Sequence, residues 1–182
     1  VRSELGIPSD AIVFSYIGRH SKIKGYDMLK KIGEYLFRNN NNIYFLIAGK
    51  EYPISGLKHP NWIEVGWTTD PHSYVNASDF FILPNRETYF DLVLLEVLSL
   101  GVHIILSDCG GNNYFKKYSD NSDISFFKTD DLKSMSNVIN ELIEHKKNKS
   151  NLTSVNKSIF KLNYSLKPFT KRYLDLYGSI NI

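Results

Sequence analysis

The chain has 182 residues, of which 42% are hydrophobic and 23% are charged. This balance is ordinary for a globular domain, so it excludes wholesale disorder, and the length suffices for one full-sized domain but is short for two. The net charge of +3, without a clustered basic stripe, argues against nucleic acid as a partner. We expect the one basic run, residues 144–151, to be a solvated loop.

Cysteine, histidine and hydropathy patterns narrow the class further. The single cysteine, Cys109, excludes an internal disulfide and favours a reducing, cytoplasmic compartment. None of the five histidines has a Cys or His partner at metal-ligand spacing, so we expect no metal site. No apolar run reaches the roughly 18–20 residues of a membrane span. The start, VRSELG, is not a signal peptide and lacks an initiator Met, which predicts a fragment beginning in mid-protein.

Short apolar runs alternate with helical patterns along the chain. In order, the sequence predicts a strand at 11–17, a helix at 26–39, strands at 43–49 and 62–67, a helical turn at 70–77, a strand at 79–84, a helix at 91–101, a strand at 102–107, a short helix at 113–118, a strand at 123–128 and a helix at 130–147. This alternation favours an α/β fold, a Rossmann-like open parallel sheet of about six strands with helices on both faces. We expect residues 1–182 to form one such domain.

Residues 150–182 are predicted to form a C-terminal helical tail, broken near Pro168. The tail is rich in aromatic residues. We expect these side chains to pack onto the body of the domain: Phe160, Tyr164, Phe169, Tyr173 and Tyr177.

The loops that follow the strands carry the candidate ligand groups, because ligands of such sheets bind beyond the carboxyl ends of the strands. The first loop, GRHSKIKG, contains Gly18, Arg19, Lys24 and Gly25. Glycines let a ligand approach the backbone, and the two cations would neutralise a diphosphate. The alternative is that Arg19 and Lys24 are solvated loop cations.

The helix predicted to begin near Asp91 points its N-terminus at the same loops. Its free N–H groups around Leu92 and Val93 would form an anion site, although Asp91 is a natural N-cap that would occupy one of them. Glu96 is the carboxylate of this apolar helix, about 7.5 Å along its axis. It could hold the two hydroxyls of a ribose, or instead form a core ion pair with one of the loop cations.

Other features have plain structural explanations. The Gly110-Gly111 pair is weak evidence on its own and could be only a turn. His20 and His103 are predicted to be packing or surface residues rather than catalysts. Tyr89 and Phe90 are predicted to pack in the core rather than to stack on a ligand.

Taken together, the stretches GRHSKIKG, FLIAGK, IEVGW, YVNASDFFILPNRE, FDLVLLEVLSLGVHIILSD and CGG resemble the C-terminal, nucleotide-sugar-binding domain of a GT-B glycosyltransferase of the large retaining family 4. The resemblance runs from about residue 1 to 145 in the right order and spacing. It implies a Rossmann-like donor domain whose acceptor-binding N-terminal domain lies outside this chain.

The resemblance also implies roles for individual residues. Arg19 and Lys24 would grip the donor diphosphate and Glu96 the ribose. The remaining donor-binding positions would be the backbone at Gly18, the base-contacting loops at Gly49 and Gly66-Trp67, and the phosphate-binding amides of Leu92 and Val93. The implied donor is a nucleoside-diphosphate sugar, with no metal cofactor, because the cations and the helix terminus neutralise the phosphates.

One departure concerns the contacts to the donor sugar. The family pattern is E-G-F-G-L followed by any three residues and a second E, so seven residues lie between its two Glu. Here eight residues lie between Glu87 and Glu96. Aligning back from Glu96 puts Thr88 at the first Glu, Tyr89 at the first Gly and Asp91 at the second Gly. Either Glu87 reaches the sugar through a one-residue bulge, as a catalytic residue, or Thr88 with Asp91 takes its place. A second departure is Tyr114, where the family often has an acidic residue.

We therefore expect retaining sugar transfer, with UDP as the carrier, to a glycan or lipid-linked acceptor in bacterial surface polysaccharide biosynthesis. The isolated domain should bind donor but turn over poorly. The expected location is cytoplasmic, peripheral at the inner face of the membrane through the missing domain. The alternatives are a sugar-nucleotide epimerase of GT-B architecture and a non-catalytic, degenerate donor domain that serves as a partner subunit.

Overall fold

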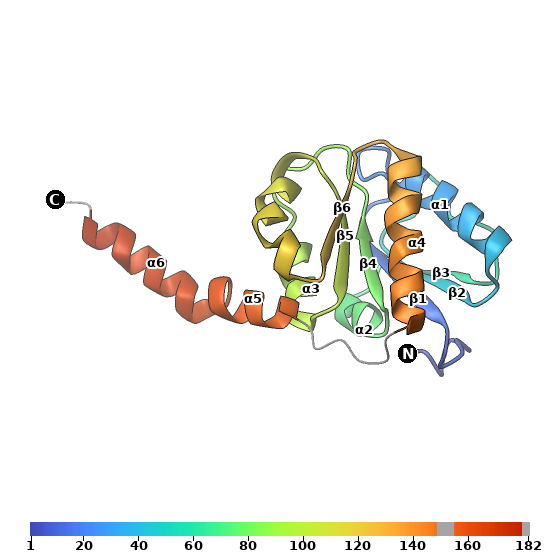
Figure 1. The fold of residues 1–182 in the computed structure, drawn as a ribbon, viewed down its shortest axis with the longest axis horizontal. Coiled ribbons are helices and arrows are strands. Elements are labelled where there is room, and N and C mark those ends of the chain that lie inside the picture. The colour runs from blue at the N-terminus through green and yellow to red at the C-terminus, as the bar shows by residue number, and fades with distance from the viewer. Residues whose placement is uncertain (149–154, 180–182) are drawn as a thin grey trace.

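The protein folds around one six-stranded sheet. A computed structural model describes residues 1–148 and 155–179 (Figure 1). All strand pairs are parallel, in the order β3-β2-β1-β4-β5-β6. The strands are β1 (Ile12–Ile17), β2 (Ile43–Ala48), β3 (Trp62–Gly66), β4 (Phe80–Leu83), β5 (His103–Ser107) and β6 (Ile124–Phe127).

Helices cover both faces of this sheet. They are α1 (Tyr26–Asn39), α2 (Pro71–Asn76), α3 (Val93–Leu100), the 3₁₀ helix η1 (Gly110–Asn121), α4 (Leu132–Asn148), α5 (Val155–Asn163) and α6 (Leu166–Ser179). α1 and α4 pack on one face, and α3, η1 and α5 pack on the other. The predicted α/β class, the six parallel strands and the helices on both faces are confirmed.

Each central strand contributes to both layers of the core. In β4, Phe80 and Ile82 lie in the layer with α1 and α4, whereas Phe81 and Leu83 lie in the layer with α3. All four side chains are buried. Successive side chains of a strand point to opposite faces, so a strand covered on both sides must be apolar throughout, as this run is.

The strand order places the candidate site. β1 lies between β2 and β4, so the chain leaves β1 toward one side of the sheet and returns later to add β4 on the other. The loops after β1 and β4 therefore diverge at this point and leave a crevice beyond the carboxyl ends of the strands. In open α/β sheets this switch point is where ligands bind.

Most strand and helix bounds lie within one or two residues of the sequence prediction, and the following differences are the informative ones. Helix α3 begins at Val93 rather than near Asp91, and the short helix predicted at 113–118 is the longer 3₁₀ helix η1. Residues 144–148 belong to α4 and are not a loop, because the apolar stripe of Met135, Ile139 and Ile143 continues the helix into them. Residues 149–151 of the predicted loop lie outside the described residues.

The C-terminal tail is helical but is arranged differently from the prediction. The break falls at residues 164–165, between α5 and α6, and Pro168 lies in the first turn of α6, where a missing N–H costs nothing. Residues 150–154 and 180–182 of the predicted tail lie outside the described residues.

The prediction that the tail aromatics pack onto the body is only partly correct. Phe160 and Tyr164 do contact the core layer around α3. The prediction is wrong for Phe169, Tyr173 and Tyr177, which are at least half exposed. α6 extends away from the sheet, so these three rings stack on one another instead of on the core (Figure 1).

Candidate functional site

Two cavities open at the carboxyl ends of the strands, on either side of the loop that follows β1. The larger, of about 640 Å³, lies between the loops after β1 and β4 and is closed by the turn after β5. The smaller, of about 250 Å³, lies between the loops after β1, β2 and β3. The larger cavity therefore sits at the switch point of the sheet, with the smaller one beside it, and the larger has the volume of an ordinary small-molecule site.

The structure divides the predicted site residues between these cavities. Lys24, Glu87, Thr88 and Asp91 line the larger cavity together with Ile23, Arg86, Tyr89, Phe90 and Gly110. Gly18, Arg19, Gly49 and Trp67 line the smaller one. Gly66, Leu92, Val93 and Glu96 belong to the adjoining elements and line neither.

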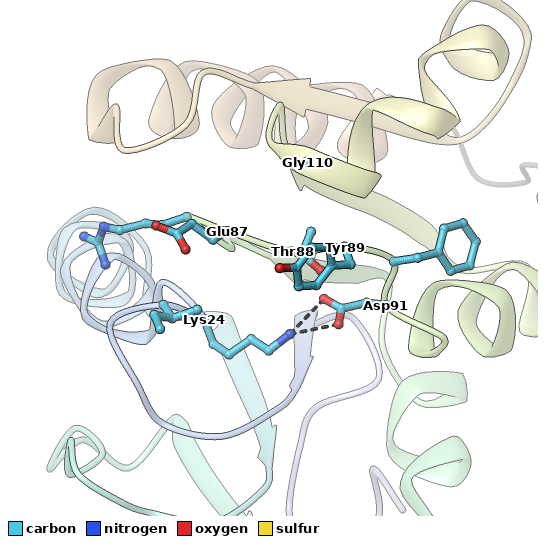
Figure 2. A pocket seen from close by; sticks show the side chains of 9 residues that line it. Lys24, Glu87, Thr88, Tyr89, Asp91 and Gly110 are labelled. Atoms are coloured by element: carbon cyan, nitrogen blue, oxygen red, sulfur yellow. Dashed lines mark hydrogen bonds and ion pairs between the residues drawn. The ribbon is translucent and has the colours of Figure 1, made fainter.

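Lys24 and Asp91 form an ion pair across the larger cavity. The Lys24 Nζ donates to both carboxylate oxygens of Asp91, at 2.8 and 3.0 Å (Figure 2). The side-chain amide of the buried Asn85 also donates to this carboxylate. The prediction that Asp91 caps the helix is wrong, because the N-cap is Leu92 and makes no side-chain hydrogen bond. The Asp91 side chain has a lysine and an amide within reach, and an ionised donor is a stronger partner than a backbone N–H.

The N-terminus of α3 keeps its amides free. In the part of the chain that the structure describes, the amides of Leu92 and Val93 donate no hydrogen bond, and the first amide to do so is that of Leu94, to Asp91 O at 3.0 Å. Free amides at a helix N-terminus attract an anion, and the helix dipole adds to that attraction.

Glu96 lies in the first turn of α3, about 4.5 Å along the axis from Val93 rather than 7.5 Å from the helix start. It is not a desolvated carboxylate, because its side chain is 45% exposed. Its partner is neither loop cation but His72 of α2, whose Nε2 lies 3.1 Å from Glu96 Oε2. Sequence reasoning missed His72. The contact depends on how α2 and α3 pack, and the sequence carries no signal for it.

The smaller cavity is built by a close approach of two loops. A Cβ added at Gly49 would lie 2.0 Å from the carbonyl oxygen of Gly18, so only glycine permits this contact. Gly49 also donates to Gly66 O at 2.8 Å, which joins the third loop to the same wall. Trp67 is 77% exposed beside it. Arg19 is exposed, and within the described residues its guanidinium makes no hydrogen bond or ion pair.

Arg86 holds the loop that carries Lys24. Its guanidinium donates to both carboxylate oxygens of Asp27 in the first turn of α1, at 2.6 and 2.9 Å, and to Lys22 O. Its backbone N–H donates to Ile23 O at 2.8 Å. The hydrogen bonds from Arg86 hold the pKa of the Asp27 carboxyl below its usual range, which keeps the pair ionised. In the sequence, the only signal for these contacts is a cation in the loop after β4.

His20 is a packing residue, as predicted. It is fully buried, and its ring stacks on Tyr26 at 3.8 Å. Burial lowers its pKa, against the opposing effect of the nearby Glu64. Glu64 in turn accepts hydrogen bonds from Tyr26 and Trp62 at 2.6 and 2.7 Å. This buried cluster therefore packs around His20 and fixes the first loop where that residue lies.

The Gly110-Gly111 turn does more than reverse the chain. Gly111 N donates to Thr88 O at 3.0 Å, and a Cβ at either glycine would meet the backbone carbonyl of Thr88 or Tyr89 (Figure 2). The turn therefore fixes the main chain of the loop after β4. The prediction that Tyr89 packs in the core is wrong, since the residue is 100% exposed. The turn holds its backbone, and its ring lies in solvent.

Among residues 1–148 and 155–179, no group of three or more His, Cys, Asp or Glu side chains is arranged to hold a metal ion. Over the same residues, every helix is too short or too polar to cross a membrane.

Comparison with known proteins agrees with this architecture. Residues 11–145 match the family model of the group 1 glycosyl transferases. The chain is 25% identical to the Escherichia coli O-antigen biosynthesis glycosyltransferase WclY over 98% of its own length and 50% of the relative. It is 30% identical to the Campylobacter jejuni N,N'-diacetylbacillosaminyl-diphospho-undecaprenol alpha-1,3-N-acetylgalactosaminyltransferase, over 73% of this chain and 34% of that enzyme.

A crystal structure of Anabaena HepE in complex with UDP-glucose superposes with a TM-score of 0.79 at 16% identity, covering 98% of this chain and 51% of that one. The chain thus spans about half the length of the first relatives it matches. With the family model covering most of the sheet and its helices, the chain belongs to the group 1 glycosyl transferases, and its fold is that of the C-terminal, donor-binding half of a GT-B enzyme.

Proposed function

We propose that this chain binds a nucleoside-diphosphate sugar, with uracil as the base, for retaining transfer of the sugar to a glycan or lipid-linked acceptor. The observation that carries the proposal is the first loop, which supplies Arg19 to the smaller cavity and Lys24 to the larger. A ligand with two linked phosphates, a base on one side and a sugar on the other, matches two cavities joined by cations.

Charge neutralisation is the chemistry we assign to this loop. Sugar transfer leaves negative charge on the departing diphosphate, and preorganised cations and amides stabilise that charge. Arg19, Lys24 and the free amides of Leu92 and Val93 would serve this purpose without a metal. Because Lys24 is already paired with Asp91, the diphosphate must compete with that carboxylate.

We assign the nucleoside to the smaller cavity. Gly18, Gly49, Gly66 and Trp67 would contact the base, because Gly18, Gly49 and Trp67 line this cavity and Gly66 is bonded to its wall. Glu96 would hold the ribose hydroxyls. Its pairing with His72 orients the carboxylate, so we assign His72 as a positioning residue for the ribose.

The donor sugar would lie in the larger cavity. Glu87 and Thr88 both line it, so two ways to contact the sugar hydroxyls stay open. Either a one-residue bulge brings Glu87 to the sugar, or Thr88 and Asp91 contact it together. The carboxylate of Asp91 would bond a sugar hydroxyl only after Lys24 has turned to the phosphate.

The complete protein would add an acceptor-binding N-terminal domain, and residues 1–182 would be its single donor domain. Surface polysaccharide biosynthesis is supported by the O-antigen and diphospho-undecaprenol enzymes among the relatives, and a UDP-sugar by the ligand named for HepE. We propose a bacterial protein of the cytoplasm, peripheral at the inner face of the membrane. An epimerase of the same architecture and a degenerate partner subunit are the alternative functions.

Binding measurements test this function. We would titrate UDP, GDP, ADP, CMP and UDP-sugars into the wild type, Arg19→Ala and Glu96→Ala, with Arg38→Ala and Glu141→Ala as exposed, remote controls of the same residue types. A ligand at 100 times its Kd adds about 2.7 kcal/mol to the free energy of unfolding. We expect UDP to bind and Arg19→Ala to bind it roughly 10- to 100-fold more weakly, the effect of losing charged hydrogen bonds.

The competing functions give other results. A degenerate subunit predicts no nucleotide binding to the folded wild type. An epimerase predicts that the full-length protein converts a UDP-sugar to an epimer or free sugar without acceptor. Unchanged UDP affinity in folded Arg19→Ala would contradict the assignment of Arg19 to the diphosphate.

A further inference from the structure

The loop after β4 presents an aromatic ring at the mouth of the larger cavity. Tyr89 is 100% exposed, although it lines that cavity. A single exposed aromatic residue is ordinary, but this one lines a cavity, and the next residue, Phe90, which is 39% exposed, lines it too. An exposed aromatic ring at the mouth of a cavity that also holds polar groups is typical of a binding site.

The backbone that carries Tyr89 is fixed while its ring is free. The carbonyl oxygen of Thr88 accepts a hydrogen bond from Gly111 N, and a Cβ at Gly111 would lie 1.5 Å from Tyr89 O. The glycine turn therefore packs directly against the main chain at this position (Figure 2). A ligand that covers the ring need not order the loop first, which lowers the entropic cost of binding.

The groups around the ring define the ligand class. Lys24, Glu87, Thr88 and Asp91 offer hydrogen-bond donors and acceptors inside the cavity, and Tyr89 offers an apolar face at its edge. A pyranose has both complements, because its hydroxyls radiate from the edge of the ring while one face presents C–H groups. The face of an aromatic ring carries negative charge density, which attracts such weakly positive C–H groups, and their mutual burial adds a hydrophobic gain.

We propose that Tyr89 is the stacking platform for a pyranose ring in the larger cavity and so a specificity-determining residue. This inference rests on the proposed function. The pyranose is either the sugar of the UDP donor or the terminal sugar of the acceptor, since both must meet at this cavity for transfer. A nucleobase is the competing occupant, and the cavity between the loops after β2 and β3 is the better place for it.

Calorimetry with Tyr89→Ala and Tyr89→Phe tests the inference. The ligands are UDP, then UDP-glucose, UDP-galactose and UDP-N-acetylglucosamine, and finally methyl α-glucopyranoside titrated in the presence of saturating UDP. Tyr177→Ala, an exposed tyrosine of α6, is the matched control. We expect Tyr89→Ala to bind UDP within twofold of the wild type and to lose about three- to tenfold in affinity for a pyranose ligand. Tyr89→Phe should retain that affinity, because the ring face and not the hydroxyl makes the contact.

The ligands separate the two sources of the sugar. Loss confined to the UDP-sugars identifies the donor sugar as the stacked ring, and loss confined to the glucopyranoside identifies the acceptor. An equal loss for UDP and UDP-sugars, a Tyr89→Phe protein that behaves like Tyr89→Ala, or no change in any pyranose affinity would overturn the inference while the proposed function stands. A folded wild type that binds no UDP would overturn both.

Discussion

Replacing Gly111 by alanine should displace the loop that lines the larger cavity. A Cβ at Gly111 would lie 1.5 Å from Tyr89 O, 2.4 Å from its carbonyl carbon and 3.0 Å from Phe90 Cα. All three neighbours are backbone atoms, so no side-chain rotation can relieve the clash. Because Cβ atoms do not approach other heavy atoms closer than 3.0 Å, the carbonyl oxygen and the turn must separate by at least 1.5 Å.

This displacement has two measurable consequences. Overpacking against rigid neighbours typically costs about 1–3 kcal/mol of folding free energy. The movement also carries Thr88 and Tyr89 away from the cavity, and an error of about 1 Å in a positioned group can reduce a rate or affinity that depends on it by up to about 100-fold. Lys24 lies on the first loop, which is bonded to Arg86 two residues before Thr88, and Arg19 lines the smaller cavity. We therefore expect UDP-sugar affinity to fall more than UDP affinity.

The assay is urea denaturation combined with calorimetry of UDP and UDP-glucose for Gly111→Ala. The control is Gly178→Ala in α6, where an added Cβ meets nothing within 4 Å and alanine favours the helix. Gly178→Ala should leave both affinities unchanged and be neutral or slightly stabilising. A Gly111→Ala protein with the wild-type urea midpoint and unchanged affinity for both ligands would show that the glycine turn does not position the loop after β4.

Two further predictions follow from charges in the structure. Asp91→Asn removes the carboxylate that competes for Lys24, so UDP should bind up to about fivefold more tightly at low salt; weaker UDP binding in a calorimetric titration would contradict the competition. Burial holds His103 neutral in the folded state by lowering its pKa from 6.5 to about 4, whereas the unfolded chain takes up a proton near pH 6.5. Stability is therefore lost as the pH falls from 6.5 to 4, and urea unfolding should show the wild type losing about 2 kcal/mol more than His103→Gln between pH 7 and pH 5.

The sheet was predictable because its strands are apolar on both faces. Runs such as 79–84 and 102–107 admit no solvent-exposed position. Earlier in the chain, the helical spacing of Met28, Leu29 and Ile32 marks α1, whose observed bounds match the prediction. Local hydrophobicity and tertiary burial agree in these segments.

The site was predictable only as a set of loops. That Lys24 and Asp91 pair, and that His72 faces Glu96, depends on how loops and helices approach across the sheet. Sequence periodicity carries no such information for single polar residues. The prediction for Phe169 failed for a related reason: an apolar stripe indicates that a helix has a face to cover, but not what covers it.

Two departures from the family pattern lie at the larger cavity. Tyr89 and Asp91 stand where the resembling family has glycine, and both line the larger cavity, one with a free ring and the other with a charge that holds Lys24. The smaller cavity keeps its close glycine contact at Gly49 and its unpaired Arg19 among the described residues. A nucleotide is common to many transferases, whereas the transferred sugar and its acceptor distinguish them. Under the proposed function, substitutions at the larger cavity would change the sugar that is bound and leave the nucleotide site intact.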